Sequence, residues 1–240
     1  MAVVVPVIDE GERIARQLVK MEPIARDVDV IIADGGSQDG SLSEAHLRSR
    51  GVRALLTKTG PGRLSAQMRM AMAWGIDQGY AGFVFLDGND KDDPAAIPSF
   101  VRALEEGYDH LQGSRYVPGG RAVNTPFLRH WAVRLVHAPL ISLSAGKRYT
   151  DTTNGFRGYS ARFLLDRRVQ PFRDCFAAYE LHYYLAIRAA RLGFRVAELP
   201  VTRVYPSGKT PTKISPLRGN LRILRTLLRA VLHRYDPQGT

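Results

Sequence analysis

The sequence predicts an α/β fold in which a mostly parallel central sheet is flanked by helices. Short apolar runs rich in β-branched residues alternate with segments whose apolar residues recur at helical spacing, and this alternation is typical of parallel sheets covered on both faces. Three predicted strands also run directly into acid-rich loops, and in such sheets ligands bind outside the carboxyl ends of the strands. The 240 residues are 45% hydrophobic and 24% charged, which fits one globular body and excludes a disordered chain.

In the first half of the chain, predicted strands and helices follow one another in strict alternation. The first strand is a valine-rich run, and the helix after it repeats apolar residues at Ile14, Leu18 and Met21. The predicted strands are Val3–Ile8, Asp29–Asp34, Val52–Thr57 and Gly82–Asp87, and the predicted helices are Glu10–Arg26, Ser41–Arg50 and Arg63–Gln78.

From about residue 115 the alternation becomes less regular. Residues 124–145 predict a helix that Pro139 interrupts, because proline lacks the N–H that a helix interior needs. No internal repeat or Gly/Ser linker separates the two halves, so we expect both in one compact body. The remaining predicted elements are the strand Phe156–Tyr159, the helix Cys175–Leu192, the strand Arg195–Val204 and the helix Pro216–Tyr235.

The chain carries a net charge of +11, from 34 Lys and Arg against 23 Asp and Glu. Such a surplus indicates an anionic partner, which is nucleic acid, a lipid surface or a phosphorylated substrate. The single Cys175 excludes an internal disulfide and suits a reducing compartment. No apolar run reaches the roughly 18 residues of a membrane span, and the chain begins in a predicted strand without a signal peptide. We therefore expect a cytoplasmic protein.

The first two acidic loops allow both a structural and a ligand-binding interpretation. Asp9 and Glu10 follow the first strand, where they can cap the next helix and complement its dipole. In residues 33–41, ADGGSQDGS, the glycines allow the backbone to turn tightly and to approach a ligand. Asp34 at the strand end is suited to a ribose hydroxyl or a base edge. The alternative is an ordinary glycine-rich turn.

The third acidic loop lies in residues 83–98, FVFLDGNDKDDPAAIP. Asp87 and Asn89 are two positions apart at a strand end, so their oxygens can face one Mg²⁺ or Mn²⁺ together with a diphosphate. The neighbouring Asp90 should point elsewhere if the strand continues. A solvated turn that caps the next helix explains Asp93 before Pro94, but it does not explain four acids on a basic protein.

Taken together, the loops resemble those of the inverting family 2 glycosyltransferases with the GT-A fold, in the branch of dolichol-phosphate mannose and polyprenyl-phosphate sugar synthases. Two positions depart from the family pattern: Gly35 replaces the second Asp of D-D-G-S, and Asn89 replaces the second Asp of D-x-D. The matching segments, in order, are VPVIDE at 5–10, DGGSQDGS at 34–41, GR at 62–63 with alanines at 66 and 71, DGN at 87–89, GSRY at 113–116, DTTNGFR at 151–157, and ELPV at 198–201 followed by TKI at 212–214.

The resemblance implies a Rossmann-like GT-A domain over residues 1–215, with a nucleotide-binding half (1–115) and an acceptor half (116–215). It implies transfer with inversion from a GDP- or UDP-sugar to a polyprenyl or other lipid phosphate. Asp87 and Asn89 would hold Mg²⁺ or Mn²⁺, and the neutral amide of Asn89 would attract the cation more weakly than a second Asp. The residues implied in donor binding are Pro6, Glu10, Asp34, Arg63, Asp87, Arg115, Arg203, Lys209 and Lys213.

The chemistry of sugar transfer explains why such a site needs basic residues and, for some acceptors, a general base. Negative charge builds on the departing diphosphate, and the basic residues would stabilise it. A hydroxyl acceptor also needs a general base, for which Asp151 is the first candidate and Asp93 the second. A lipid phosphate is already ionised and needs none. The alternative for Asp151 is a turn in which its side chain bonds the backbone beside Thr152 and Thr153.

The C-terminal segment is strongly basic. Residues 201–240 hold eight Lys and Arg against one acid, Asp236, which is a net charge of +7. A stripe of arginines beside a stripe of leucines predicts a basic amphipathic helix at 216–240 that lies peripherally on an anionic membrane, at its cytosolic face. The alternatives are a helix whose leucines join the core or a homodimer contact. The arginines are at positions 218, 222, 225 and 229, and the leucines at 217, 221, 224 and 228.

Other functions are less well supported. No helix-turn-helix, RNP or zinc pattern is present, so we do not expect nucleic acid as a partner. A sugar-phosphate nucleotidyltransferase would need a glycine-rich loop after the first strand, and residues 6–12 contain none. A catalytically weak nucleotide-sugar-binding protein is the other alternative, to which Gly35 and Asn89 point.

Overall fold

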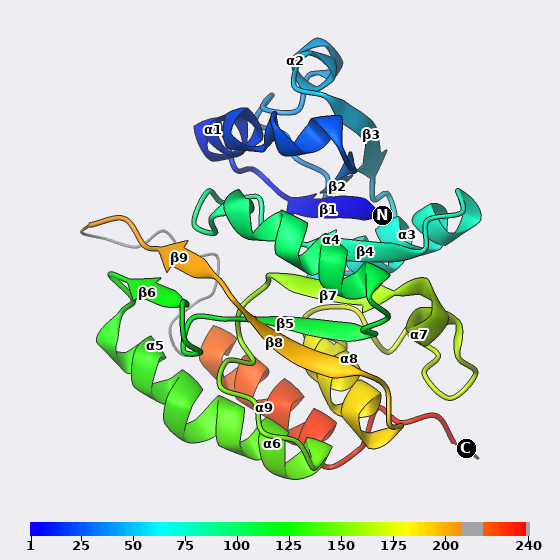
Figure 1. Ribbon diagram of the computed structural model, residues 1–240, viewed down its shortest axis with the longest axis vertical. Helices are drawn as coiled ribbons and strands as arrows, with labels where there is room; N and C mark the ends of the chain where they lie inside the picture. The colour runs from blue at the N-terminus through cyan, green and yellow to red at the C-terminus, as the bar shows by residue number, and fades with distance from the viewer. Residues whose placement is uncertain (208–217, 239–240) are drawn as a thin grey trace.

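The computed structural model describes residues 1–207 and 218–238. In this part of the chain seven strands form one sheet in the order β3-β2-β1-β4-β7-β5-β8 (Figure 1). Neighbouring strands are parallel except around β7, which is antiparallel to β4 and to β5. The mostly parallel sheet predicted from the sequence is therefore confirmed. The strands are β1 (Ala2–Val7), β2 (Asp29–Asp34), β3 (Val52–Thr57), β4 (Gly82–Phe85), β5 (His110–Ser114), β7 (Arg157–Ser160) and β8 (Val196–Pro200).

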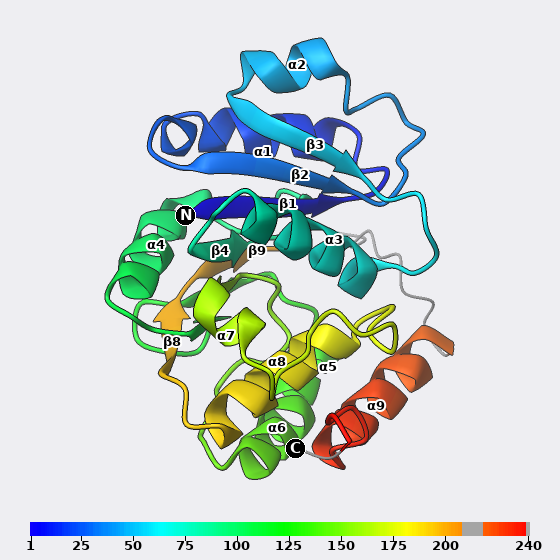
Figure 2. The same cartoon turned by 90° about the vertical axis from the view of Figure 1, so that its right-hand side faces the viewer.

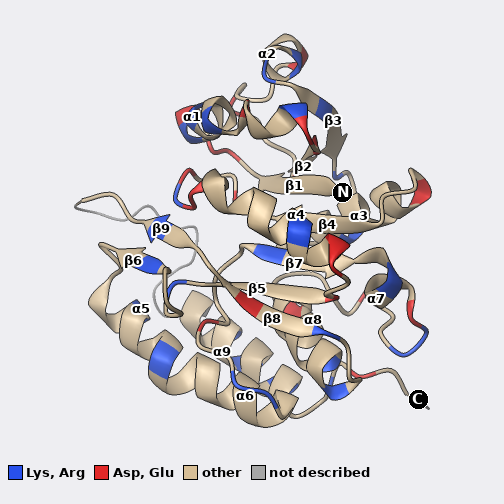
Figure 3. Ribbon diagram, in the orientation of Figure 1, with Lys and Arg blue, Asp and Glu red and all other residues tan. Residues whose placement is uncertain are grey.

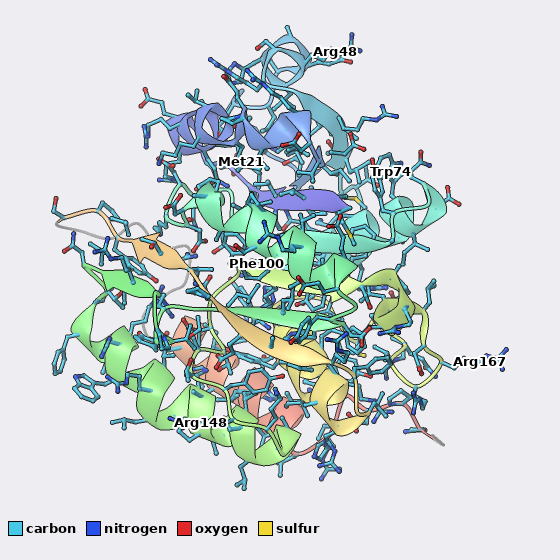
Figure 4. The ribbon with its side chains drawn as sticks, viewed as in Figure 1. Met21, Arg48, Trp74, Phe100, Arg148 and Arg167 are labelled. Carbon is cyan, nitrogen blue, oxygen red and sulfur yellow. The ribbon has the colours of Figure 1, made fainter. Side chains whose placement is uncertain are left out.

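Helices cover both faces of the sheet (Figure 2). Along β1, Val3 and Val5 pack into one apolar cluster while Val4 packs into the other, because successive side chains of a strand point to opposite faces. Met21 and Phe100, labelled in Figure 4, belong to the first cluster. Its helices are α1 (Glu12–Met21), α2 (Glu44–Ser49) and α4 (Ile97–Glu105); those of the second are α3 (Leu64–Asp77), α6 (Ala138–Ala145), α7 (Ala161–Leu165), α8 (Glu180–Arg191) and α9 (Arg218–Val231); the short 3₁₀ turns are η1 (Ile24–Arg26) and η2 (Pro94–Ala96).

Pro139 does not interrupt the helix predicted at 124–145, and this expectation was wrong. The helical segment begins at Phe127 and runs through α5 (Phe127–Ala132), a π-helical turn η3 (Val133–His137) and α6. Pro139 lies in the first turn of α6, directly after the wider π turn. The change of hydrogen-bond pattern at the π turn accommodates the missing N–H.

The predicted strand 195–204 divides at its centre. Its first part, β8, pairs with β5 in the main sheet, whereas β9 (Thr202–Val204) pairs with β6 (Arg121–Val123) in a separate two-stranded sheet. This division carries Arg203 away from the main sheet and next to Asp92, with which it forms an isolated bridge. The helix predicted from Cys175 begins later, at Glu180.

Helix α9 packs against α8 and α6 through Leu227 and Ala230 (Figure 2). The predicted leucine stripe is a different face of the same helix, and its described members are exposed, so they do not join the core. No helix in the described residues is both long and apolar enough to cross a membrane. The exposed fractions are 68% for Leu221, 40% for Leu224 and 43% for Leu228.

Candidate functional site

A pocket of about 1310 Å³ opens where β1, β2 and β4 end. The structure brings most of the predicted donor-binding residues to its wall. Asp34, Asp93 and Asp151 do not line it, and Lys209 and Lys213 lie outside the described residues. The predicted residues that line the pocket are Pro6, Glu10, Arg63, Asp87, Asn89, Arg115 and Arg203.

The first two acidic loops bond to each other. Asp9 accepts a hydrogen bond from the backbone N–H of Gln38 (2.8 Å), and Asp39 accepts one from the N–H of Gly11 (2.7 Å). Asp9 therefore does not cap α1, whose N-cap residue is Gly11. Asp34 is only 5% exposed, and its Oδ1 accepts from the backbone N–H (2.8 Å) and the hydroxyl (2.7 Å) of Ser37. Its carboxylate shapes the loop behind the pocket wall.

Arg203 on β9 joins two acids of the third loop. Its Nη2 donates to Oδ2 of Asp87 (3.0 Å), and its Nη1 donates to Oδ2 of the buried Asp92. Burial raises the pKa of Asp92 to about 6, and the nearby Asp87 carboxylate adds to the rise. Burial also raises the pKa of Asp87, but the Arg203 guanidinium outweighs it and holds that pKa below its ordinary value. Asp87 therefore lines the pocket as an anion.

The carboxylate of Asp87 lies very close to the backbone of Gly155. A Cβ atom at Gly155 would lie 2.4 Å from Oδ1 of Asp87, so only glycine leaves room for this carboxylate. Asp90 has a φ of 58° and turns its own carboxylate away, onto Lys20 (2.6 Å) and Arg16 (3.2 Å) of α1. Asp90 therefore does not compensate for the missing second Asp of D-x-D.

Asp87 and Asn89 carry the kinds of oxygen atom that Mg²⁺ and Mn²⁺ prefer, but in this structure the amide nitrogen of Asn89 faces Asp87. The Nδ2 of Asn89 lies 3.4 Å from Oδ2 of Asp87, and the Oδ1 of Asn89 accepts from the N–H of Lys91 (3.3 Å). Within residues 1–207 and 218–238, no cluster of three or more His, Cys, Asp or Glu could hold a metal ion. A cation at this pair would need further ligands from substrate or water.

Asp151 lies behind the pocket in a buried ion pair with Arg115. Its Oδ2 accepts from Nε (2.6 Å) and its Oδ1 accepts from Nη2 (3.0 Å). Burial raises the pKa of Asp151, but Arg115 and the N–H of Thr153 outweigh it and lower the pKa below its ordinary value. A general base must reach the proton that it removes. In this structure Asp151 orients Arg115, and its expected role as a general base stays a prediction.

Asp93 is exposed and accepts a hydrogen bond from the backbone N–H of Ala95 (3.0 Å), as a cap of η2. The capping interpretation therefore accounts for its position, and its expected role as a second general base has no support from the pocket geometry. Arg157, on the antiparallel strand β7, lines the pocket and donates to backbone oxygens of Thr152, Asn154 and His182.

Sequence reasoning missed several residues of the pocket wall. His182, which is not among the residues predicted for the site, lines the pocket, and burial lowers its pKa to about 3. Lys91 directly follows the DGND segment, and that adjacency was an available signal. The other missed residues come from elements whose place depends on the tertiary structure. They are Lys58, Gln67, Arg129, Arg157 and Tyr205.

The far wall of the pocket is largely apolar. It is formed by α5, η3 and α9, which all belong to the second half of the chain. Arg129 adds a cation there and donates to the Tyr205 hydroxyl (3.1 Å). The apolar residues of this wall are Leu128, Ala132, Val133, Val136, Ile223 and Leu224.

Comparison with known proteins decides the family. Residues 2–168 match the family model described as Glycosyl transferase family 2. The chain belongs to this family. It is 31% identical over 207 residues to the undecaprenyl-phosphate mannosyltransferase of Micrococcus luteus, and this match covers 84% of this chain and 82% of that protein. It is 27% identical over 203 residues to the polyprenol monophosphomannose synthase of Mycolicibacterium smegmatis, which covers 83% of this chain and 76% of that protein.

The family 2 chain also has the fold that the resemblance implied. Glucosyl-3-phosphoglycerate synthase from Mycobacterium tuberculosis, in complex with Mn²⁺, UDP and phosphoglyceric acid, superposes with a TM-score of 0.69 at 18% identity, over 99% of this chain and 79% of that one. The GT-A fold is therefore confirmed, and the protein is a glycosyltransferase.

Proposed function

We propose that this family 2 enzyme transfers a sugar from a GDP- or UDP-sugar to a polyprenyl phosphate, with inversion at the sugar carbon. The observation that carries the proposal is a pocket in which a cationic, acid-rich end is continuous with an apolar wall. A nucleoside diphosphate suits the cationic, acid-rich end, and a prenyl chain suits the apolar wall. The names of the relatives from M. luteus and M. smegmatis support a polyprenyl phosphate as the acceptor.

At the donor end, Pro6 and Glu10 would hold the nucleoside, behind which Asp34 shapes the loop. Arg63, Arg115 and Arg203 would bind the diphosphate. Asp87 and Asn89 would hold Mg²⁺ or Mn²⁺, whose positive charge offsets the charge that builds on the departing phosphate. The Mn²⁺ and UDP in the complex from M. tuberculosis support this arrangement. We include Lys209 and Lys213 as further diphosphate-binding residues.

At the acceptor end, the phosphate of the lipid would enter beside Arg129 and attack the sugar from the side opposite the diphosphate, which inverts its configuration. This nucleophile is already ionised and needs no general base. The buried Arg115–Asp151 pair supports such an acceptor, because the carboxylate is used to hold an arginine. A hydroxyl acceptor would need a base within reach of its proton.

The outer surface of the apolar wall suits attachment to an anionic membrane. Of the sixteen exposed large hydrophobic side chains in the described residues, ten lie on the segment 127–143 or on 221–232. Residues 124–148 and 218–231 contain no Asp or Glu, and Figure 3 shows basic but no acidic residues along the long helix labelled α5 and α6. The ten are Phe127, Leu128, Trp131, Leu135, Val136, Leu143, Leu221, Leu224, Leu228 and Leu232, of which Leu128, Val136 and Leu224 also line the pocket.

Charge decides between a bilayer and a second copy as the partner of this surface. Two copies placed face to face would oppose arginines to arginines with no acid between them, which is unfavourable. An anionic bilayer complements the arginines and accepts the apolar side chains. We therefore propose peripheral attachment at the cytosolic face, where anionic lipids give the surface a negative potential.

The proposal is tested by incubating the purified protein with radiolabelled GDP- and UDP-sugars and liposomes that contain undecaprenyl phosphate. We expect label to enter the lipid phase with one donor, and no transfer to undecaprenol, which lacks the phosphate. Equal transfer to undecaprenol would contradict a phosphate nucleophile. Donor binding without turnover in any arm would favour the catalytically weak binding protein, and the absence of nucleotide binding would overturn the proposed function.

A further inference from the structure

Gln67 on α3 fastens the ends of two central strands at the pocket. The side chain is 4% exposed, and its Nε2 donates to the backbone oxygens of Val7 (2.8 Å) and Ala33 (2.8 Å). These oxygens lie at the carboxyl ends of β1 and β2, which are parallel neighbours. Both hydrogens of the amide are thereby used, and the orientation of the side chain follows from them.

The same amide lies against Gly35, the position at which the resemblance leads one to expect an acid. A Cβ atom at Gly35 would lie 3.0 Å from Nε2 of Gln67 and 3.2 Å from its Cδ. The Cβ of Ile8 would also lie 3.2 Å away, and the φ of Gly35 is not positive, so crowding by Gln67 and Ile8, rather than the backbone conformation, favours glycine here. A neutral amide from α3 therefore fills the space beside the strand end where a carboxylate would otherwise project.

Gln67 lines the pocket together with Pro6 and Gly35, at the end proposed above for the nucleoside. Because both amide hydrogens are donated to the strands, the oxygen Oε1 is the polar atom that Gln67 can offer to a ligand. This atom is a hydrogen-bond acceptor without charge. The position therefore calls for a ligand group that donates one hydrogen bond.

We propose that Oε1 of Gln67 accepts a hydrogen bond from the ring N–H of the donor's base and so selects uracil or guanine. Uracil carries a hydrogen on N3 and guanine on N1, whereas the corresponding ring nitrogens of cytosine and adenine are acceptors. An acceptor facing Oε1 would leave both atoms unpaired in a partly buried site, which is the strongest basis for discrimination between similar ligands. The inference rests on the proposed function, because it assigns the base of the donor in the same pocket.

The test compares UDP with N3-methyl-UDP and GDP with N1-methyl-GDP by titration calorimetry. Methylation removes the ring hydrogen, and the ratio of the two dissociation constants reports whether the protein reads it. Two variants distinguish recognition of the ring hydrogen from support of the strand ends. Gln67→Met and Gln67→Glu both lose the hydrogen bonds to Val7 and Ala33, but only Gln67→Glu keeps an acceptor oxygen. Gln17→Met is the control for loss of a buried glutamine's hydrogen bond to the backbone: Oε1 of Gln17 accepts from the N–H of Asp90 (2.8 Å), and Gln17 lies outside the pocket wall.

We expect wild-type protein, Gln17→Met and Gln67→Glu to prefer the unmethylated nucleotide, and Gln67→Met to lose roughly two- to tenfold of that preference, the range of one neutral hydrogen bond. Equal preference in Gln67→Met and wild type would overturn the inference. Equal loss in Gln67→Met and Gln67→Glu would also overturn it, because support of the strands would then be the cause. If wild-type protein binds neither UDP nor GDP, the proposed function fails as well.

Discussion

Arg115 and Asp151 form a buried two-point ion pair beside the pocket, with Nε–Oδ2 and Nη2–Oδ1 distances of 2.6 and 3.0 Å. Behind this pair, Glu198 of β8 accepts hydrogen bonds from the backbone N–H groups of Thr150 (2.9 Å) and Asp151 (3.1 Å). The arginine is therefore held from the interior of the protein, and the carboxylate acts on the pocket through it.

Replacing Asp151 with Asn should lower the free energy of unfolding by about 3–5 kcal/mol, because it leaves the Arg115 charge buried without a partner. The pKa of Asp151 is lowered in the folded state, so the carboxylate stabilises fully above the unfolded pKa near 3.8, and this stabilisation is lost as the pH falls through the folded pKa. In urea unfolding at pH 4–8, the difference in the free energy of unfolding between wild type and variant should be constant above about pH 5.

The control for Asp151→Asn is Asp109→Asn, which breaks another ion pair with a buried aspartate, to Arg162, away from the pocket. Both variants should lose stability, but only Asp151→Asn should also slow sugar transfer at a temperature where both remain folded. A limb in the pH–rate profile between pH 5 and 7 that disappears in Asp151→Asn would instead restore Asp151 as a general base.

Asp92 predicts a change of stability with pH in the opposite direction. Its pKa is raised to about 6 in the folded protein, which therefore holds the proton more tightly than the unfolded chain. Its contribution to stability is highest below the ordinary pKa of 3.8 and decreases as the pH rises to about 6. Urea unfolding at pH 4.5 and 6.5 measures the change. Between these pH values the free energy of unfolding should decrease less in Asp92→Asn than in wild type, by on the order of 1–3 kcal/mol. An identical decrease in both proteins would show that Asp92 is ionised throughout.

Restoring the second acid of D-x-D should strengthen metal binding. In Asn89→Asp, a carboxylate replaces the neutral amide two positions after Asp87, and Mn²⁺ should bind roughly tenfold more tightly because a second anion faces it. Mn²⁺ titration followed by electron paramagnetic resonance, with UDP or GDP present, measures the change. Asp87→Asn should weaken binding in the same assay. Unchanged affinity in both variants would remove the third loop from the metal site.

The proposed membrane surface predicts binding that depends on both charge and apolar contact. Wild-type protein should sediment with phosphatidylglycerol vesicles more than with phosphatidylcholine vesicles, and rising salt should release it. The double variant Trp131→Glu/Leu228→Glu should bind these vesicles at least roughly tenfold more weakly, because two apolar side chains that would enter the bilayer are lost. Leu165→Glu is the control, since Leu165 is 58% exposed on α7, outside the surface. Equal binding by the double variant, or a dimer in solution that it disrupts, would contradict the proposal.

Much of the first half of the chain could be predicted from the sequence. The strands β1 and β2 are buried on both faces, so they are continuous apolar runs, and the acidic loops follow them directly. The interruption at Pro139 was predicted wrongly, because the sequence does not reveal the π turn that accommodates the missing N–H of this proline. Strand β5, HLQGS, was not predicted at all, since a short polar run has no periodicity and is a strand through its pairing with β7 and β8.

The sequence by itself determined the order of strands and loops, the family motifs and the concentration of positive charge near the C-terminus. The tertiary structure alone decided which charged groups meet. Arg115 and Asp151 are 36 residues apart, and Arg203 and Asp87 are 116 residues apart. Periodicity records contacts between residues a few positions apart, whereas an ion pair, or an amide such as that of Gln67 beside Gly35, depends on the packing of distant elements.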